Sequence, residues 1–107
     1  MMYCVSFNSS EVFGYSVIVA LTETDSEATF QRFLEDAYTS FQDYVVNWAL
    51  TNLFSSLNDA ADDDEIEERL ERIREECYLE SVEEIRDTKP FTNCEIYTTD
   101  DGFNIDW

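Results

Sequence analysis

The sequence predicts an α+β domain in which an antiparallel sheet of two hairpins carries two long helices on one face, in the element order ββααββ. Three observations favour this fold. Stretches near both ends of the chain have strand-like composition, the middle repeats apolar residues at helical spacing, and turn-forming residues separate these regions. With 107 residues the chain can bury one core but not two, so residues 1–107 are expected to form a single acidic domain.

The N-terminal part of the chain predicts a β-hairpin. Residues 2–7 (MYCVSF) place Tyr3, Val5 and Phe7 on one side of a strand, and residues 15–22 (YSVIVALT) are β-branched and apolar on both sides. The intervening NSSEVFG is rich in turn-forming residues and ends in a glycine. An antiparallel connection is therefore expected, whereas the strand order of the whole sheet stays open.

Residues 25–57 are predicted to be helical, either as one bent helix or as two. Thr24 and Glu27 fit a capping box, with Thr24 capping the helix N-terminus. Apolar residues then recur every three or four positions, and the phase of the repeat shifts near residues 47–51. The residues expected to face the sheet are Phe30, Leu34, Ala37, Phe41, Tyr44, Val45 and Trp48, followed after the shift by Leu50, Leu53, Phe54 and Leu57.

A second long helix is predicted to begin with Asp62 or Asp63 as its cap and to run to about Asp87, because Pro90 forbids its continuation. Its apolar residues form two narrow stripes at helical spacing. One stripe consists of Ile66, Leu70, Ile73 and Cys77, and the neighbouring one of Tyr78, Val82 and Ile85.

The C-terminal segment predicts the second hairpin. Asp101-Gly102 is a favoured two-residue turn between strands. In the register that this turn sets, Ile96 lies opposite Trp107.

Charge limits the function more than any motif does. The chain has 25 Asp and Glu residues against six Lys and Arg, a formal charge of −19. Such a surface repels DNA, RNA and anionic lipid, which are bound through Lys and Arg, so a direct contact with nucleic acid or with a membrane is excluded. The longest apolar stretch, YVVNWALTNLF, is too short and too polar to span a bilayer, and the N-terminus does not resemble a signal peptide. A cytoplasmic protein is expected.

The chain offers little for catalysis. It has no histidine and only two glycines, so His-based acid–base chemistry and a glycine-rich phosphate loop are both missing. The acidic run from Asp59 does not fit a calcium-binding EF-hand, because Asp64 stands where glycine is needed and Leu70 where a bidentate glutamate is needed. The three cysteines form no C-x-x-C pair, which argues against a zinc module and a disulfide framework. We therefore expect a protein that is not an enzyme and has no metal or cofactor.

Residues 62–87 combine thirteen acids with four arginines, and four of the acids recur at spacings of four, three and four residues. On a helix this spacing stacks Asp64, Glu68, Glu71 and Glu75 along one face. A solvated helix held by Glu/Arg pairs at i,i+4 is the ordinary explanation, but the arginines are too few, and the like-charged pairs cost about as much as the opposite pairs contribute. We interpret the acidic face as a surface for a basic partner.

The candidate partner-binding residues all come from this acidic segment. They are Asp62, Asp63, Asp64, Glu67, Glu68, Glu71, Glu75, Glu76, Glu80, Glu83 and Glu84. The acids of the C-terminal segment are the next candidates, namely Glu95, Asp100, Asp101 and Asp106.

In size, acidity and lack of catalytic residues, the chain resembles the small phage- or plasmid-encoded inhibitors that mimic DNA, which include antirestriction proteins, anti-CRISPR proteins and inhibitors of uracil-DNA glycosylase. The resemblance is one of composition. It implies a protein that places carboxylates where phosphates would lie in the groove of a nucleic-acid-binding host enzyme, with a CRISPR effector as the first choice of target. The alternatives are an immunity or antitoxin protein that neutralises a cognate basic nuclease, and an ordinary domain adapted to high salt. A homodimer is left open.

Overall fold

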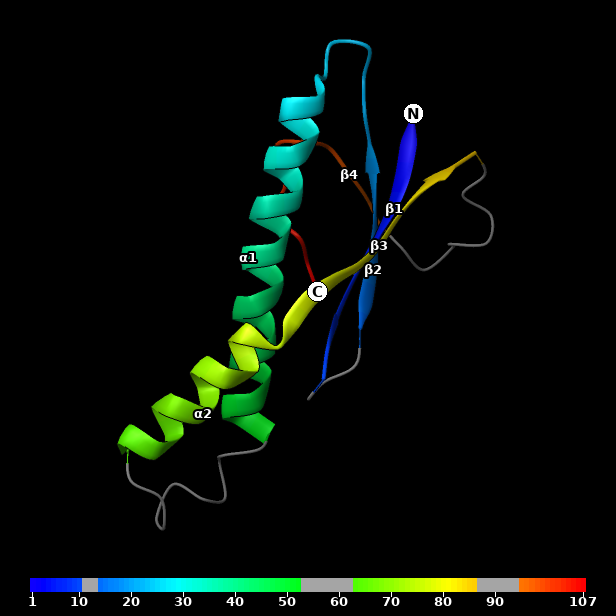
Figure 1. Ribbon diagram of the computed structural model, residues 1–107. Coiled ribbons are helices and arrows are strands. Elements are labelled where there is room, and N and C mark those ends of the chain that lie inside the picture. Colours follow the sequence, from blue (N-terminus) through cyan, green and yellow to red (C-terminus); the bar gives the residue numbers. More distant parts are fainter. Residues whose placement is uncertain (11–13, 53–62, 87–94) are drawn as a thin grey trace.

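Two strands, two helices and two further strands follow one another in the computed structural model (Figure 1). The structure describes residues 1–10, 14–52, 63–86 and 95–107. The elements are β1 (Met2–Ser9), β2 (Tyr15–Ala20), α1 (Glu27–Asn52), α2 (Asp63–Glu75), β3 (Cys77–Ile85) and β4 (Ile96–Tyr97). The predicted α+β class agrees with this mixture of one sheet and two helices.

The sheet has the strand order β3-β1-β2-β4 and is mixed. β1 pairs antiparallel with β2 on one side and with β3 on the other, whereas β2 and β4 run parallel. The N-terminal hairpin was therefore predicted correctly, with Val5 opposite Val17. The prediction of an antiparallel sheet built from two hairpins is wrong, because residues 103–107 form no strand and β4 runs parallel to β2. The edge strand β3 comes from a segment that was predicted to be helical.

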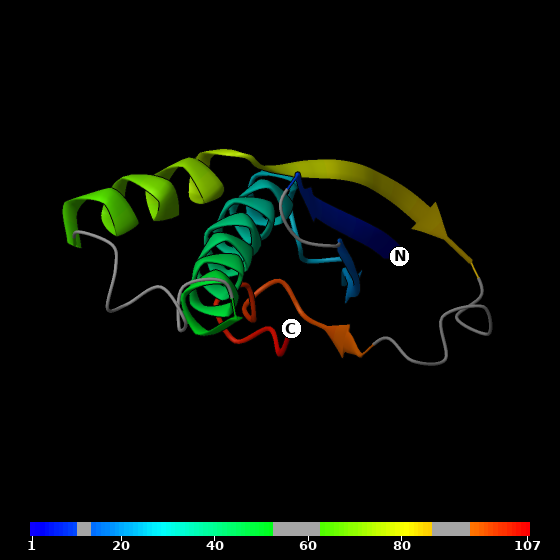
Figure 2. The same cartoon turned by 90° about the horizontal axis from the view of Figure 1, so that it is seen from below.

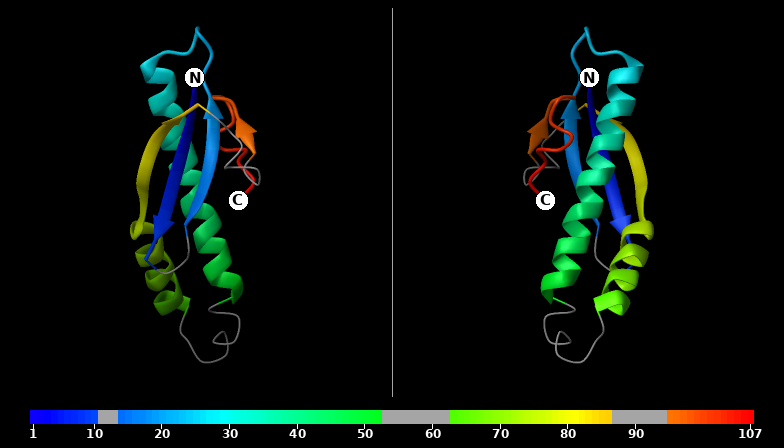
Figure 3. Two further views of the ribbon diagram at one scale, coloured as in Figure 1. Left: turned by 90° about the vertical axis from the view of Figure 1, so that its right-hand side faces the viewer. Right: turned by 90° about the vertical axis from the view of Figure 1, so that its left-hand side faces the viewer.

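Helix α1 is one continuous helix that lies across one face of the sheet (Figure 3). This decides between one helix and two for residues 27–52, while residues 53–57 lie outside the described part of the chain. Its fully buried side chains recur every fourth residue and pack with strand residues such as Phe7, whose ring stacks on that of Phe41 at a centroid distance of 5.6 Å. The buried residues of α1 are Phe33, Ala37, Phe41, Val45 and Ala49. Of the predicted face, Phe30, Leu34, Tyr44 and Trp48 pack at the border of this core. The predicted phase shift near residues 47–51 is wrong, because Ala49 continues the repeat of four and Leu50 is exposed.

The N-terminus of α1 is capped by Ser26 and not by the predicted Thr24. The Ser26 hydroxyl accepts a hydrogen bond from the backbone N–H of Thr29 at 3.2 Å. The residues before it form a separate turn, in which the backbone N–H of Thr22 donates to the Asp25 carboxylate at 2.8 Å. Because Asp25 is held in this turn, the helix starts at Glu27.

The second helix is half as long as predicted. α2 ends at Glu75, and residues 77–85 form strand β3, which pairs with β1. β1 is the buried second strand of the sheet, so its outward-facing N–H and C=O groups need partners that a helix at 77–85 would not supply. The strand also spreads the glutamates, since Glu80 and Glu84 are about 13 Å apart along an extended chain but only about 6 Å apart on a helix.

The C-terminal segment does not form the predicted hairpin. β4 is only two residues long and pairs with β2, and Thr98 and Asp101 close a turn in which the Asp101 N–H donates to the Thr98 carbonyl at 3.1 Å. Gly102 packs directly on α1: a Cβ at this position would lie 2.5 Å from the Cβ of Asp36. The glycine is thus explained by the close approach of the segment to α1, after which Trp107 packs against the ring of Phe41.

Candidate partner-binding surface

Helix α2 buries one narrow face and exposes the opposite one. Ile66 and Ile73 are buried in the main core, and Leu70 packs at its border, as the sequence predicted for this stripe. At 100° per residue, the four acids predicted to stack lie within an arc of about 60° on the side opposite these residues. All four are exposed. We call this set, Asp64, Glu68, Glu71 and Glu75, the acidic ridge.

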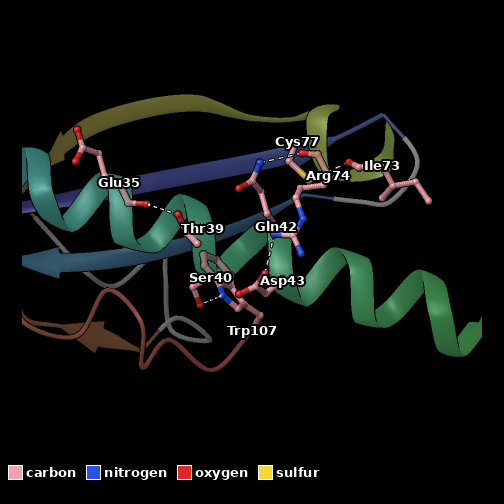
Figure 4. A network of polar contacts seen from close by, with 9 residues as sticks. All are labelled: Glu35, Thr39, Ser40, Gln42, Asp43, Ile73, Arg74, Cys77 and Trp107. Atoms are coloured by element: carbon pink, nitrogen blue, oxygen red, sulfur yellow. Dashed lines mark hydrogen bonds and ion pairs between the residues drawn. The ribbon is translucent and has the colours of Figure 1, made fainter. Parts of the chain in front are cut away.

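Side chains of α1 fix the end of α2 and therefore the direction of the acidic ridge (Figure 4). The Gln42 side-chain amide donates to the carbonyl of Arg74 at 3.0 Å, and the Tyr38 hydroxyl donates to the carbonyl of Cys77 at 2.6 Å. The Arg74 guanidinium forms an ion pair with the carboxylate of Asp43 at 2.7 Å. The Gln42 amide thus satisfies one of the last carbonyls of α2, which has no intrahelical partner, and the Tyr38 hydroxyl ties the first residue of β3 to α1.

The acidic ridge is not neutralised by the described residues. The ion pair of Arg74 with Asp43 is the one found among residues 1–10, 14–52, 63–86 and 95–107. Within that part of the chain, no ion pair forms between Glu65 and Arg69 or between Glu68 and Arg72, although the ordinary explanation of the helix requires these i,i+4 pairs. The acids from Asp64 to Glu75 therefore face solvent without the intrahelical ion pairs that would stabilise a simple surface helix.

The predicted partner-binding residues fall into three groups. Asp62 lies outside the described part of the chain, and Asp63 begins α2. On α2, the exposed candidates are Asp64, Glu67, Glu68, Glu71 and Glu75. On β3, they are Glu80, Glu83 and Glu84.

Glu76, at the junction of α2 and β3, differs from the other candidates because it is half-buried. Its carboxylate accepts a hydrogen bond from the hydroxyl of Ser10 at 2.7 Å. The prediction of one continuous carboxylate helix from residue 62 to residue 87 is wrong beyond Glu75. The acids are instead divided between a helix of 13 residues and the following strand.

The sequence did not indicate the groove between α1 and β3. It is a wide, open groove of about 340 Å³, with Phe7 at its floor, Leu34 and Tyr38 of α1 on one side and Leu79 of β3 on the other. Tyr78, Leu79 and Val82 are exposed by 47%, 41% and 37%, so β3 leaves apolar surface uncovered. The β-forming residues of YLESVEEI were the available signal, but their spacing also fits a helix.

The groups whose pKa is perturbed lie away from the acidic ridge. A hydrogen bond with the Tyr44 hydroxyl at 3.1 Å raises the pKa of Tyr15 to about 12. Burial raises the pKa of Cys77, whose thiol donates to the carbonyl of Ile73 at 3.4 Å. Among the described residues, no group of three His, Cys, Asp or Glu side chains is arranged to hold a metal ion. Within the same ranges, no helix has the length and apolar character needed to cross a membrane.

Comparison with protein-family models, with curated proteins and with solved structures finds no match for this chain.

Proposed function

We propose that the protein is an inhibitor of the phage or plasmid type that mimics DNA and blocks the basic nucleic-acid groove of a host defence enzyme. A guide-loaded CRISPR effector is the first candidate target and a restriction enzyme the second. The observation that supports this proposal most is the acidic ridge, because its four carboxylates are exposed, lie on one side of α2 and form no ion pair with the described residues.

The density of charge on α2 suits this role. The helix carries seven acids in 13 residues, or about one per 3 Å over an axial length of about 20 Å. Phosphates on one DNA strand are spaced by about 3.4 Å along the axis, so α2 spans the length of about six nucleotides with a similar spacing of acids, although its arginines Arg69, Arg72 and Arg74 offset part of that charge. The contact is therefore expected to be short, and a deep, strongly basic groove suits it better than a flat surface.

The test is capture from host lysate on immobilised protein, comparing the natural chain with two variants of equal net charge. The first variant reverses Glu68, Glu71 and Glu75 to Lys on the ridge. The second reverses Glu23, Asp100 and Asp106 to Lys, which are exposed and lie outside α2 and β3. We expect the natural chain and the second variant to retain a nucleic-acid-binding enzyme that elutes as salt rises, and the ridge variant to lose it.

The identity of the captured enzyme distinguishes a DNA mimic from an immunity or antitoxin protein. A CRISPR effector or a restriction enzyme whose DNA binding is blocked by the added protein would support the mimic. A single basic nuclease would indicate the immunity or antitoxin function. Capture of the same proteins by the natural chain and the ridge variant would contradict a role for the ridge. Loss of capture with the second variant alone would assign binding to acids outside α2 and β3, namely Glu23, Asp100 or Asp106.

A further inference from the structure

Strand β3 lies at an edge of the sheet and is long for an edge strand. It has nine residues, or about 30 Å of extended chain, and pairs with β1 on one side only among the described residues (Figure 2). An edge of this kind leaves a row of backbone N–H and C=O groups that can pair with another extended chain.

A β-bulge places the apolar residues of β3 beside the groove. In the register with β1, Val5 lies opposite Val82 and Phe7 opposite Leu79, so that Glu80 is the extra residue between them. Directly opposed residues share a face of the sheet, and Phe7 forms the floor of the groove under α1. Leu79 and Val82 therefore lie on the face that carries α1, next to the groove.

The charges beside this edge select what can bind there. Glu80, Glu83 and Glu84 are exposed on β3, and Glu35 of α1 lines the groove. Pairing of two β3 strands in a homodimer would bring these glutamates close together, in addition to joining two molecules of formal charge −19. The same glutamates would attract an extended segment that is rich in Lys or Arg.

We propose that β3 binds an extended basic segment of a partner protein as an added strand. Backbone hydrogen bonds form along the outer edge of β3, one apolar side chain enters the groove beside Leu79, and Lys or Arg side chains meet Glu83 and Glu84. This site is separate from the acidic ridge and does not require the proposed function, because any basic partner with an exposed extended segment satisfies its chemistry.

The test uses a ten-residue peptide of alternating lysine and valine with one central leucine. A matched peptide is N-methylated on alternate residues, so that it keeps the charge and the side chains but cannot form a ladder of hydrogen bonds on that edge. Binding is measured by NMR titration of the complete protein at physiological salt. We expect the first peptide to shift the amide signals of residues 79–85 and the N-methylated peptide to bind at least about tenfold more weakly.

Two pairs of isosteric substitutions test the site on the protein. Glu83→Gln with Glu84→Gln, and Glu68→Gln with Glu71→Gln, change the net charge equally. We expect the β3 pair of substitutions to lower the affinity for the lysine–valine peptide by about fivefold, and the ridge pair to lower it by less than about twofold. The proposal would be overturned if the two pairs of substitutions lowered the affinity for the peptide equally, or if the two peptides bound equally well. It would also be overturned if the protein formed a homodimer through β3 and the peptide no longer shifted the amide signals of this strand.

Discussion

Reversing one charge on the acidic ridge should stabilise the protein, and Glu71→Lys is the sharpest case. Three acids, Glu67, Glu68 and Glu75, lie three or four residues from Glu71, and one arginine, Arg74, lies at i+3. A like-charged pair at this spacing costs about 0.2–0.5 kcal/mol, and an opposite pair contributes a similar amount. Lysine makes three repulsive pairs attractive and one attractive pair repulsive.

The net gain is therefore equivalent to converting two pairs, or about 0.8–2 kcal/mol. The lower part of this range applies, because these side chains are exposed and the arginine is already held by a carboxylate of α1. A gain of about 1 kcal/mol in the free energy of unfolding raises the Tm of a domain of this size by about 4–8 °C.

The assay is urea and thermal unfolding at low salt and in 1 M NaCl. The control is Glu23→Lys, which changes the net charge equally at an exposed loop position outside the ridge. We expect a larger gain for Glu71→Lys at low salt and near equality of the two variants in high salt, where the Debye length is only about 3 Å. A gain no larger than that of the control, or one that survives in 1 M NaCl, would refute the explanation by local repulsion.

Three further substitutions test the packing and the turn that hold the site in place. Ile73→Ala, at the buried contact of α2 with α1, should lower the free energy of unfolding by about 2–4 kcal/mol, and a loss under about 1 kcal/mol in urea would show that α2 is not part of the cooperative core. Trp107→Phe removes the hydrogen bond from the indole N–H to the Ser40 hydroxyl at 3.0 Å and should cost about 1 kcal/mol in the same assay, with an unchanged value arguing against docking of the C-terminus. Hydrogen bonds from Thr22 hold the pKa of Asp25 below its usual range, so the contribution of this carboxylate to stability is present near neutral pH and is lost as pH falls through the lowered pKa. The Tm difference between the natural chain and Asp25→Asn should therefore shrink on acidification more than the difference between the natural chain and Asp100→Asn. An equal dependence of the two Tm differences on pH would contradict this.

Local patterns predicted the elements whose burial follows one regular period. The repeat on α1 placed Ala37, Phe41 and Val45 on the buried face, and the stripe on α2 placed Ile66 and Ile73 there. In both helices the buried side chains follow a helical spacing, so this part of the prediction is confirmed, although Phe33 and Ala49 of α1 are buried outside the predicted face. The exposure of the acidic ridge follows from the same geometry, since it lies opposite that stripe.

The pattern failed where pairing partners and local irregularities decide the structure. The bulge at Glu80 puts Leu79 and Val82 on the same face of the sheet although they are three residues apart in the sequence. A spacing of three is typical of a helix, so this strand gave a helical pattern. The partner of β3 is β1, about 75 residues earlier in the chain, and no local signal reports such a pairing. The Asp101-Gly102 turn failed for a related reason, because close packing on α1 explains the glycine equally well.

Because the charges of the acidic ridge cost stability in the isolated protein, effects on folding and effects on binding can be distinguished by experiment. When a residue that stabilises the fold is replaced, the protein becomes less stable, and any loss of binding then follows from unfolding. Glu71 belongs to the opposite class, because its charge costs stability in the isolated protein through its neighbours on the same face. A basic groove would remove this cost on binding, so reversal of the charge should raise the Tm and weaken the complex at the same time. Changes of opposite sign in one variant cannot come from misfolding, and they would identify the acidic ridge as a surface that serves a partner.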